Sequence, residues 1–417
     1  MSRHAATQIV RRLRQHGHAA VFAGGCVRDR LLGLTPKDYD VATDARPEVV
    51  RDLFPGSRSI GEAFGVVLVY PRRRDRRPDD PPRMGIEVAT FRTEGVYSDG
   101  RRPDEVAYSD AEHDAQRRDF TVNGLFEDPL HDAQPNPLAD PDGVIDYVGG
   151  RADLAGRILR AIGDPARRFA EDYLRMLRAV RFAARLGFTL APDTADAIRT
   201  HASSLDQIAR ERIGDEIRAA LTGPRPTLAA TLLQQLQLDA PALREPHADP
   251  PLPTLDRLAP EARYPTALAA WIIDRHGRPS ALNKLPDWRG ALCLSNAEAD
   301  ALTAVLRQAT AADDWGRLSV AARKRLLAAP SWDQSLLLLR ALGRSATIEA
   351  DTPRLHGDGI GIAPPPIITG ADLLALGLAP GPRFKPLLDG AYDAQLEGKT
   401  ADLESALGWV KSRLEEA

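Results

Sequence analysis

Two aspartates, Asp38 and Asp40, have the type and spacing that most directly suggest chemistry. They are separated by one residue in a strand-like segment, 38–42, and alternate residues of a strand point toward the same face of a sheet. Two carboxylates held that close repel each other unless a cation lies between them. Hard divalent cations take oxygen ligands and bridge phosphate groups, so the spacing predicts that Asp38 and Asp40 bind a pair of Mg²⁺ ions.

A glycine pair and an arginine precede the two aspartates. Gly24 and Gly25 lie between a predicted strand, 19–23, and a predicted helix, 27–32. The backbone can approach a phosphate closely at glycine, and the N–H groups at a helix start can bind it. Arg28 falls in the first helical turn and could reach the same phosphates. An Asp-x-Asp pair or a Gly-Gly turn alone is weak evidence, but their order and spacing together predict a phosphate-binding metal site.

The elements that must position these residues form a segment with mixed helix and strand periodicity and a small, mostly antiparallel sheet. Pro47 stands where the first turn of a helix should start. The stretch 71–83 is too polar and proline-rich to be anything but an exposed connection between strands. The predicted helices are 3–16, 27–32 and 114–126, and the predicted strands are 19–23, 38–42, 66–70 and 86–91.

After Asp146 the pattern becomes helical and rich in Ala, Leu and Arg. We expect helix throughout 164–221 and again through 296–345. The sequence therefore predicts an α+β protein, with one mixed head followed by an elongated all-α arm. Proline or glycine clusters indicate boundaries at 222–226, 245–265 and 353–369, and the last of these precedes a compact terminal piece, 368–416.

The composition describes a globular protein with material for several cores, since 43% of the 417 residues are apolar. Cys26 and Cys293 are too few and too far apart for a disulfide scaffold or a cysteine-rich zinc module, which favours the cytoplasm. No apolar run approaches the roughly 20 residues that span a bilayer, and arginines interrupt any N-terminal signal-peptide core. The net charge of −3 gives no overall basic footprint. Lysine occurs at only six positions, so arginine, whose fork suits phosphates, supplies the other 49 of the 55 basic residues.

The run GGCVRDRLLG followed by KDYD resembles the head of the nucleotidyltransferase superfamily. More specifically, it resembles the bacterial (class II) tRNA nucleotidyltransferase and poly(A) polymerase family. The resemblance is dense over 20–220 and returns at 368–398, whereas 225–350 matches no pattern and its role stays open. The further matching motifs are IEVATFR (86–92), YSDGRRP (97–103), RRDFTVNGL (117–125), DYVGGRADL (146–154) and EDYLRMLRAVRFAARLGF (171–188).

The resemblance implies a fold and a domain order. The fold would be α+β, with a nucleotidyltransferase-type head built on a small, mostly antiparallel sheet, followed by an elongated all-α neck, body and tail. The implied domains are a catalytic head (1–150), a helical neck with the nucleotide-selecting helix (151–222), a helical body (223–350) and a tRNA-binding helical tail (351–417).

The resemblance also assigns roles around the predicted metal pair. One Mg²⁺ held by Asp38 and Asp40 would activate the primer's terminal 3′-hydroxyl, and the other would neutralise the triphosphate as pyrophosphate leaves. Gly25 and Arg28 would position the triphosphate. Glu87, on a neighbouring strand, is either a third acidic group near the metals or an ordinary strand glutamate.

The RRD motif would contact the incoming nucleotide. Arg118 and Asp119 would both bind it, with Asp119 placed for the ribose hydroxyls that distinguish NTP from dNTP. For the preceding Arg117, a surface or structural role is the alternative.

Asp172 and Arg175 would act, by resemblance, as a protein template for the incoming base. Cytosine and adenine present an amine beside an unprotonated ring nitrogen, so an aspartate can accept from one while an arginine donates to the other. Uracil and guanine present a carbonyl beside a ring N–H, so neither the aspartate nor the arginine would find a matching group. The alternative from the residues alone is an intrahelical ion pair at i and i+3. Arg178 and Arg181 continue the series, and we expect them near the triphosphate or the primer end.

We interpret the sequence as a template-independent RNA nucleotidyltransferase that adds or repairs the 3′-terminal CCA of tRNA from CTP and ATP. A relative adding only A or only CC stays open, as does poly(A) polymerase, which the lack of a marked basic tail disfavours. Intact Asp38 and Asp40 argue against a non-enzymatic RNA-binding protein. The region 92–116 shows no clear deletion and contains Tyr97, Asp99, Arg101 and Arg102, which favours the full CCA activity.

The expected partners are tRNA, CTP and ATP, with no membrane and no obligatory protein partner. The tail, 368–416, is expected to dock the tRNA body through phosphate contacts. The oligomeric state and a contact between RNA and the arginines of 71–83 stay open.

Overall fold

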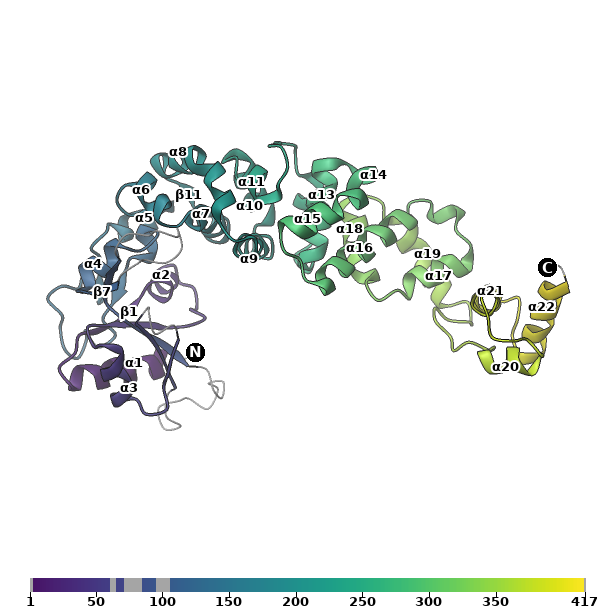
Figure 1. Cartoon of the computed structure of the whole chain (residues 1–417), viewed down its shortest axis with the longest axis horizontal. Coiled ribbons are helices and arrows are strands. Elements are labelled where there is room, and N and C mark those ends of the chain that lie inside the picture. Colours follow the sequence, from purple (N-terminus) through teal and green to yellow (C-terminus); the bar gives the residue numbers. More distant parts are fainter. Residues whose placement is uncertain (1–2, 61–64, 71–84, 95–105, 416–417) are drawn as a thin grey trace. The chain divides into compact units, whose positions relative to one another are not determined.

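The computed structural model describes residues 3–60, 65–70, 85–94 and 106–415. The predicted connection 71–83 and the residues Tyr97, Asp99, Arg101 and Arg102 lie outside the described residues. The chain forms two compact units, Met1–His247 and Ala248–Ala417, and Figure 1 labels many of their elements. The finer division at 150/151, 222/223 and 350/351 stays a prediction.

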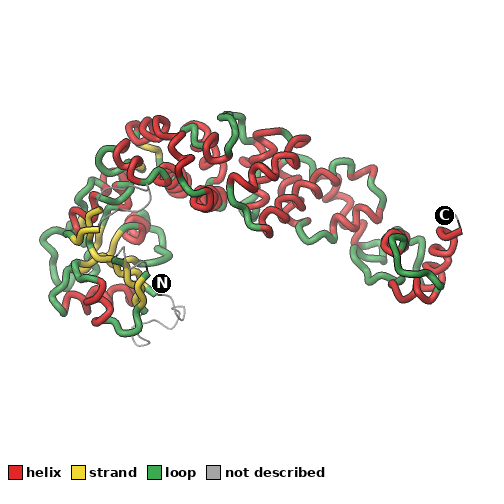
Figure 2. The backbone as a smooth tube through the Cα atoms, viewed as in Figure 1, coloured by secondary structure: helices red, strands yellow, loops and turns green. Residues whose placement is uncertain are grey.

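Within the described residues, the first unit contains a seven-stranded sheet in the order β3-β4-β5-β2-β1-β8-β9. Figure 2 shows the strands in yellow. Only β2 and β5 pair in parallel, which confirms the predicted small, mostly antiparallel sheet. A separate antiparallel pair is formed by β6 (Arg92–Glu94) and β7 (Val106–Tyr108). The strands of the sheet are β1 (Ala20–Ala23), β2 (Asp40–Thr43), β3 (Arg58–Ser59), β4 (Val66–Val69), β5 (Ile86–Thr90), β8 (Phe126–Glu127) and β9 (Val144–Ile145).

The register of β1 and β2 brings the glycine pair and the aspartates together. Asp40 is paired with Ala23, the residue that immediately precedes Gly24. Every residue of β1 is buried, and the ring of Phe22 packs against Tyr39 with centroids 5.3 Å apart. Burial of these apolar side chains holds both strands in this register, so the turn after β1 and the start of β2 share one end of the sheet.

Three helices of the head agree with the sequence predictions: α1 (Arg3–Gln15), α2 (Gly25–Leu31) and α3 (Pro47–Leu53). The apolar stripe of α1 is buried, and Pro47 stands in the first turn of α3. Arg14 of α1 pairs at 2.8 Å with the fully buried carboxylate of Asp128, which fastens this helix to the segment after β8.

The predicted helix 114–126 is wrong over most of its length. Helix α4 (Ala111–Gln116) ends before the RRD motif, and strand β8 follows it. Phe126 pairs with Ala23 of β1, and its ring packs edge-on against Phe91 with centroids 6.0 Å apart. Backbone pairing and core packing thus outweigh the local helical periodicity. The RRD motif consequently lies in an irregular segment that returns to β1.

The prediction of helix throughout 164–221 is also wrong in detail, although most of the segment is helical. Helices α6 (Pro165–Glu171) and α7 (Leu174–Leu186) are separated by an extended residue, Asp172, with φ −153° and ψ 104°. The side chain of Asp172 accepts a hydrogen bond from the backbone N–H of Leu174 at 3.0 Å. Such a local contact competes with helix continuation.

A short parallel strand pair interrupts the same segment. Strand β11 (Thr189–Leu190) pairs with β10 (Ile158–Leu159). Gly187 ends α7 in the left-handed conformation with φ 69°, which costs glycine little. The other helices of the first unit are α5 (Gly150–Gly156), α8 (Pro192–His201), α9 (Arg210–Leu221), α10 (Pro226–Gln235) and α11 (Asp239–Leu243).

The second unit is helical in its described part, and none of the described helices of the chain is long and apolar enough to cross a membrane. Its first helices pack around Trp271 and Trp288, whose rings meet edge-to-face with centroids 5.0 Å apart. The predicted helical stretch 296–345 is confirmed as three helices. The bounds are α12 (Pro253–Asp256), α13 (Tyr264–His276), α14 (Arg278–Ala281), α15 (Leu285–Ala291), α16 (Asn296–Ala311), α17 (Val320–Leu327), α18 (Trp332–Ala341), α19 (Ala346–His356), α20 (Gly370–Ala375), α21 (Phe384–Leu396) and α22 (Leu403–Glu415).

The last three helices have a small apolar core of their own. It contains Leu373, Ala391 and Val410, all buried, with the ring of Trp409 packed against the cluster. The predicted linker 353–369 begins later than expected, because α19 continues through Pro353 to His356.

Candidate active site

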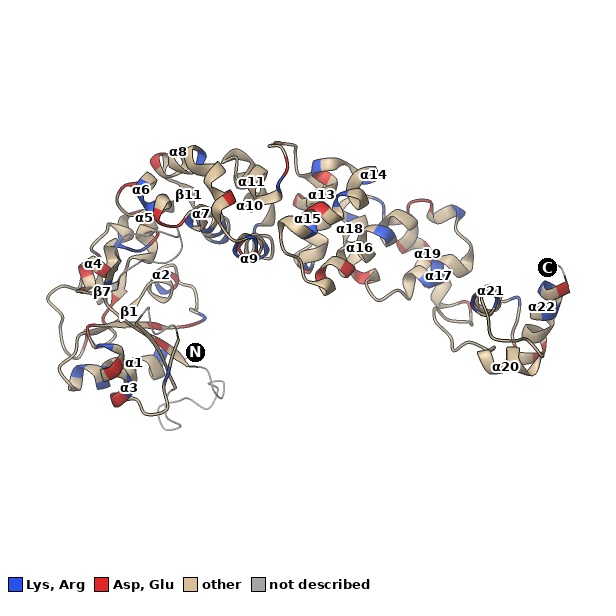
Figure 3. Ribbon diagram, in the orientation of Figure 1, with Lys and Arg blue, Asp and Glu red and all other residues tan. Residues whose placement is uncertain are grey.

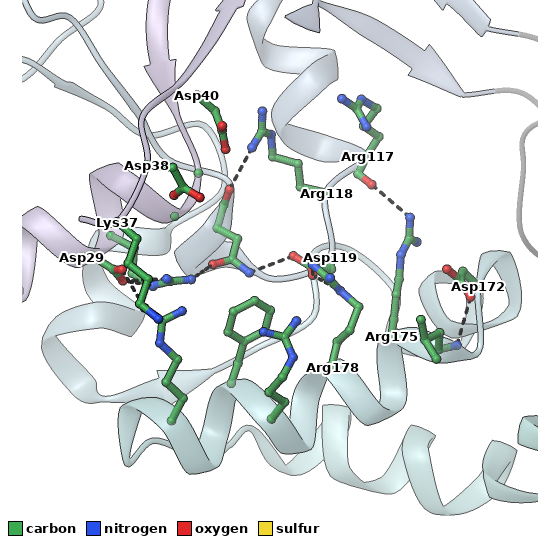
Figure 4. A pocket seen from close by; sticks show the side chains of 18 of the residues that line it. Asp29, Lys37, Asp38, Asp40, Arg117, Arg118, Asp119, Asp172, Arg175 and Arg178 are labelled. Atoms are coloured by element: carbon green, nitrogen blue, oxygen red, sulfur yellow. Dashed lines mark hydrogen bonds and ion pairs between the residues drawn. The ribbon is translucent and has the colours of Figure 1, made fainter. Parts of the chain in front are cut away.

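A cavity of about 670 Å³ in the first unit collects all of the predicted site residues. They come from the turn after β1, helix α2, the segment leading into β2, the RRD segment, the break between α6 and α7, and α7 itself (Figure 4). The residues predicted from sequence that line it are Gly24, Gly25, Arg28, Asp38, Asp40, Arg118, Asp119, Asp172, Arg175, Arg178 and Arg181. The sequence interpretation did not assign the lining residues Asp29, Lys37, Asn123, Leu174, Phe182, Arg185 and Arg212.

Asp38 and Asp40 both face this cavity, while Tyr39 between them is buried. The expected alternation is therefore present, but the strand begins at Asp40 rather than at Asp38. Burial raises the pKa of Asp40 to about 7, and the nearby charge of Asp38 adds to the rise. Glu87 on the neighbouring strand β5 acts in the same direction. Its position fits either predicted role, so that question stays open.

The donor set suits a hard divalent cation. Asp38 and Asp40 offer carboxylate oxygens, the ligands that Mg²⁺ prefers. Burial, and then the charges of Asp38 and Glu87, raise the pKa of Asp40, so a cation bound beside it would stabilise its ionised form. Among the described residues, no three acidic, histidine or cysteine side chains converge into a metal-binding group. The carboxylates that line the cavity here are those of Asp38 and Asp40, and a contribution from Glu87 stays open.

Gly24 is required by the close approach of Arg118. A Cβ at position 24 would lie 2.9 Å from Nη1 of Arg118, and the φ of Gly24 is +75°, which disfavours any side chain. Nη1 of Arg118 also donates to the carbonyl of Asn123 at 3.3 Å. Gly24 thus lets the RRD segment pack directly onto the turn after β1.

Arg28 is 2% exposed and belongs to a buried network. Its Nε and Nη2 donate to Oδ1 of Asp29 at 2.8 and 2.6 Å. The other oxygen of Asp29 accepts from Arg185 of α7 at 2.9 Å. Burial lowers the pKa of Arg28, and the charge of Asp29 opposes this effect. Asp29 therefore links α2 to α7, and the contact of Arg28 with a triphosphate stays a prediction.

Asp119 of the RRD motif is held on both oxygens. Oδ2 accepts from Nε and Nη2 of Arg178 at 2.9 and 2.6 Å, and Oδ1 accepts from Nδ2 of Asn123 at 3.0 Å. Burial alone would raise the pKa of Asp119, but Arg178 and these hydrogen bonds outweigh it and lower the pKa to about 2. Asp119 is thus ionised at neutral pH, and its contact with a ribose stays a prediction.

Asp172 and Arg175 both line the cavity, but they do not share a helix as predicted. Asp172 precedes α7, and its Oδ2 accepts from Nη2 of Arg212 on α9 at 2.7 Å. Nη1 of Arg175 is hydrogen-bonded to Glu171 and, at 3.0 Å, to the carbonyl of Arg168. The intrahelical pair that the sequence left open is replaced by partners on other elements, because the chain breaks at Asp172.

Phe182 organises the arginines farther along α7. The guanidinium of Arg181 lies 4.4 Å from its ring centroid, and those of Arg28 and Arg178 lie 5.2 and 5.3 Å away. Arg181 also pairs with Glu216 of α9 at 2.6 Å. Cation–π contacts of this kind fix guanidinium groups without consuming their hydrogen-bond donors.

Basic residues outnumber acidic ones around the cavity, and Figure 3 shows basic residues along α7 and α9. The acidic lining residues are Asp29, Asp38, Asp40, Asp119 and Asp172, and the basic ones are Arg28, Lys37, Arg117, Arg118, Arg175, Arg178, Arg181, Arg185 and Arg212. A cavity with excess positive charge and a two-carboxylate cation site suits a metal-bound polyphosphate.

Comparisons with known proteins agree with this geometry. Residues 20–160 match the family described as the poly A polymerase head domain, and 187–249 match the probable RNA- and SrmB-binding site of polymerase A. A CCA-adding enzyme of Levilactobacillus brevis is 31% identical over 412 residues, which cover 96% of each chain. The chain belongs to the class II tRNA nucleotidyltransferase family.

Two further members of this nucleotidyltransferase family show where the similarity concentrates. The CCA-adding enzyme of Geobacillus stearothermophilus is 41% identical over 233 residues, but that match spans only 52% of its length and 56% of this chain. The crystal structure of the Bacillus stearothermophilus CCA-adding enzyme in complex with CTP has a TM-score of 0.75 at 28% identity and covers 100% of this chain and 99% of that one. The fold class predicted from sequence is confirmed.

Proposed function

We propose that this nucleotidyltransferase adds or repairs the 3′-terminal CCA of tRNA from CTP and ATP, without a nucleic-acid template and with release of pyrophosphate. The observation that carries the proposal is the cavity in which Asp38 and Asp40 face Asp172 and Arg175 across a basic wall. The side with Asp38 and Asp40 suits the binding of a cation and phosphates. The side with Asp172 and Arg175 offers a hydrogen-bond acceptor and a hydrogen-bond donor to a base. The similarity to CCA-adding enzymes supports the same assignment.

The proposed cofactor is Mg²⁺, held by Asp38 and Asp40. Family members are nucleotidyltransferases, and a bound divalent cation supplies activation of the attacking hydroxyl and neutralisation of the leaving pyrophosphate. The residues of this chain orient the reactants. Arg118 and Arg178 present guanidinium groups to the cavity, with Gly24 and Gly25 beside them.

Base choice is proposed to rest on Asp172 and Arg175. An aspartate accepts from the exocyclic amine of cytosine or adenine, and an arginine donates to the adjacent ring nitrogen. Uracil and guanine place a carbonyl and an N–H at these positions, so both contacts would be lost. The carboxylate of Asp172 is already oriented by Arg212 and by the backbone of Leu174, which suits a fixed template.

The proposed macromolecular partner is tRNA, and the proposed compartment is the cytoplasm. The match of 187–249 to a probable RNA-binding region supports an RNA partner. The C-terminal helices α20–α22 form a separately packed piece that we propose docks the tRNA body.

A direct test uses tRNA transcripts that lack CCA, end in C or end in CC, each incubated with single NTPs and with mixtures. We expect C on the first two, A on the third, and complete CCA with CTP and ATP together. The variant Asp40→Asn serves as the inactive control. Addition of only A, only CC, or a continuing A tail would assign the chain to one of the alternative activities instead.

A further inference from the structure

Asp114 of α4 is a buried carboxylate that the proposed function does not use. It is 1% exposed, and two consecutive arginines share its two oxygens. Nε and Nη2 of Arg117 donate to Oδ1 at 2.9 and 2.7 Å, and Nε and Nη2 of Arg118 donate to Oδ2 at 3.2 and 2.9 Å. Each arginine therefore presents a fork to one oxygen, which fixes its orientation.

Arg118 lies between this carboxylate and the two-aspartate site. Figure 4 shows its guanidinium pointing toward Asp40, and its charge opposes the rise in the pKa of Asp40. The guanidinium also packs over the ring of Phe126 at 5.1 Å. Among the described residues, the only ion pair of Arg118 is the one with Asp114.

Two carboxylates thus compete for one guanidinium. A guanidinium in contact with Asp40 would occupy the oxygens that a divalent cation needs, and its positive charge would repel that cation. In the structure Arg118 pairs with Asp114. The carboxylate of Asp114 is buried and accepts two hydrogen bonds from Arg118, and such bonds are stronger where water is largely excluded.

We propose that Asp114 is a positioning residue that holds Arg118 away from Asp40 and so keeps the two-aspartate site open to a divalent cation. The inference rests on the proposed metal role of Asp38 and Asp40. Arg118 remains close enough to the cavity to meet a phosphate that arrives with the cation.

The test measures binding of Mn²⁺ to the purified full chain by electron paramagnetic resonance, without nucleotide or tRNA. Asp114→Asn releases Arg118, so we expect Mn²⁺ affinity to fall on the order of tenfold. Arg118→Gln alone should bind Mn²⁺ at least as tightly as the wild type. The double variant, Asp114→Asn with Arg118→Gln, should recover wild-type affinity, because no guanidinium is left to occupy the site.

Asp110→Asn is the matched control. Asp110 caps the same helix, α4, by accepting from the backbone N–H of His113 at 3.0 Å, and it is exposed. We expect its Mn²⁺ affinity to equal that of the wild type. If Asp110→Asn weakened binding as much as Asp114→Asn, damage to α4 would explain the effect and the proposal would fail.

Equal loss of affinity in Asp114→Asn and in the double variant would overturn the positioning role. If Asp114→Asn does not fold, Asp114→Glu replaces it, because glutamate keeps the charge but displaces the carboxylate by one methylene. We then expect a smaller loss of Mn²⁺ affinity, which Arg118→Gln should again reverse. A loss that Arg118→Gln does not reverse would contradict the proposal. Wild-type Mn²⁺ binding that Asp40→Asn leaves unchanged would refute the metal role itself, which separates the two failures.

Discussion

Arg212 of α9 and Asp172, at the break between α6 and α7, form an ion pair with Nη2 2.7 Å from Oδ2. The second oxygen of Asp172 accepts from the backbone N–H of Leu174 at 3.0 Å. The proposed base-reading carboxylate is therefore oriented from both sides. One of the two contacts comes from a helix that carries none of the residues assigned from the sequence.

Replacing Asp172 or Arg175 with Ala should relax base selection more than it harms triphosphate binding. A carbonyl facing the partly buried carboxylate of Asp172 costs on the order of 1–3 kcal/mol, so removal of the carboxylate should raise UTP or GTP use relative to CTP. Arg212→Ala should shift selection in the same direction but less, because Leu174 still orients Asp172.

Single-turnover addition of each NTP to tRNA ending in C measures this effect. Arg218→Ala is the matched control for Arg212→Ala. Arg218 lies on the same helix, α9, and pairs with the exposed Asp215 at 2.6 Å. If the Asp172 and Arg175 variants lost all four nucleotides in equal proportion, the two residues would be structural.

Asp40→Asn should lose nearly all nucleotide addition while tRNA binding persists, because one of the two cation-holding carboxylates is gone. Asp44→Asn provides the control: Asp44 immediately follows β2, is exposed, and its Oδ1 lies 3.2 Å from Nδ1 of His18. Addition rates with Mg²⁺ and filter binding of tRNA measure both properties. Substantial turnover by the Asp40 variant would remove this residue from the catalytic centre.

Gly24→Ala should lower stability and also impair nucleotide use. The backbone of Gly24, with φ 75° and ψ −124°, lies in a region that alanine enters at a cost on the order of 1–3 kcal/mol, and the Cβ of an alanine would meet Nη1 of Arg118 at 2.9 Å. Gly17→Ala shares the penalty of a positive φ, +84°, but its Cβ would meet nothing within 4 Å. Urea unfolding should show a lower free energy of unfolding in both variants, whereas only Gly24→Ala should raise the KM for ATP. Equal KM values in the two variants would contradict the close packing of Arg118.

Asp119 should contribute acid-sensitive stability. Its pKa of about 2 lies below the unfolded value of about 3.9, so its contribution is complete above pH 4 and is lost as the pH falls toward 2. This lowering of the pKa of Asp119 corresponds to a contribution on the order of 2 kcal/mol to the free energy of unfolding. Urea unfolding between pH 5 and pH 2.5 should therefore show a smaller stability loss for Asp119→Asn than for the wild type. Parallel curves would show that the ion pair with Arg178 adds nothing to stability.

Deleting the chain after Pro366 should leave NTP binding intact, because the cavity is lined only by residues of the first unit. We expect lower tRNA affinity, weaker dependence of that affinity on salt, and addition that stalls before the final A. Tyr392 and Gln395 bind the carbonyls of Pro364 and Pro365, so the deletion also exposes surface, and aggregation would indicate a covering role instead. A soluble truncated chain that completes CCA with unchanged tRNA affinity would rule out docking.

Local chemistry in the sequence determined much of the head. The helix 3–16, the strands at 19–23 and 86–91, the proline start at Pro47 and the spacing of Asp38 and Asp40 all follow from short-range periodicity, and the structure contains them. The family motifs that resemble nucleotidyltransferases likewise identified the residues that gather in one cavity. Periodicity and motif residues lie close in sequence, so a single chain is enough to find them.

Only the tertiary structure decided how the charges are shared. The segment 114–126 has helical periodicity, yet Phe126 leaves it to pair with β1, because sheet pairing and a core position outweigh local preference. Asp172 and Asp119 pair with arginines 40 and 59 residues away along the chain, and Asp29, besides the adjacent Arg28, pairs with an arginine 156 residues away. Every ion pair of this kind depends on which helices pack together, and the many arginines of the sequence are locally indistinguishable. Tertiary packing selects the distant arginine that meets each of these three carboxylates.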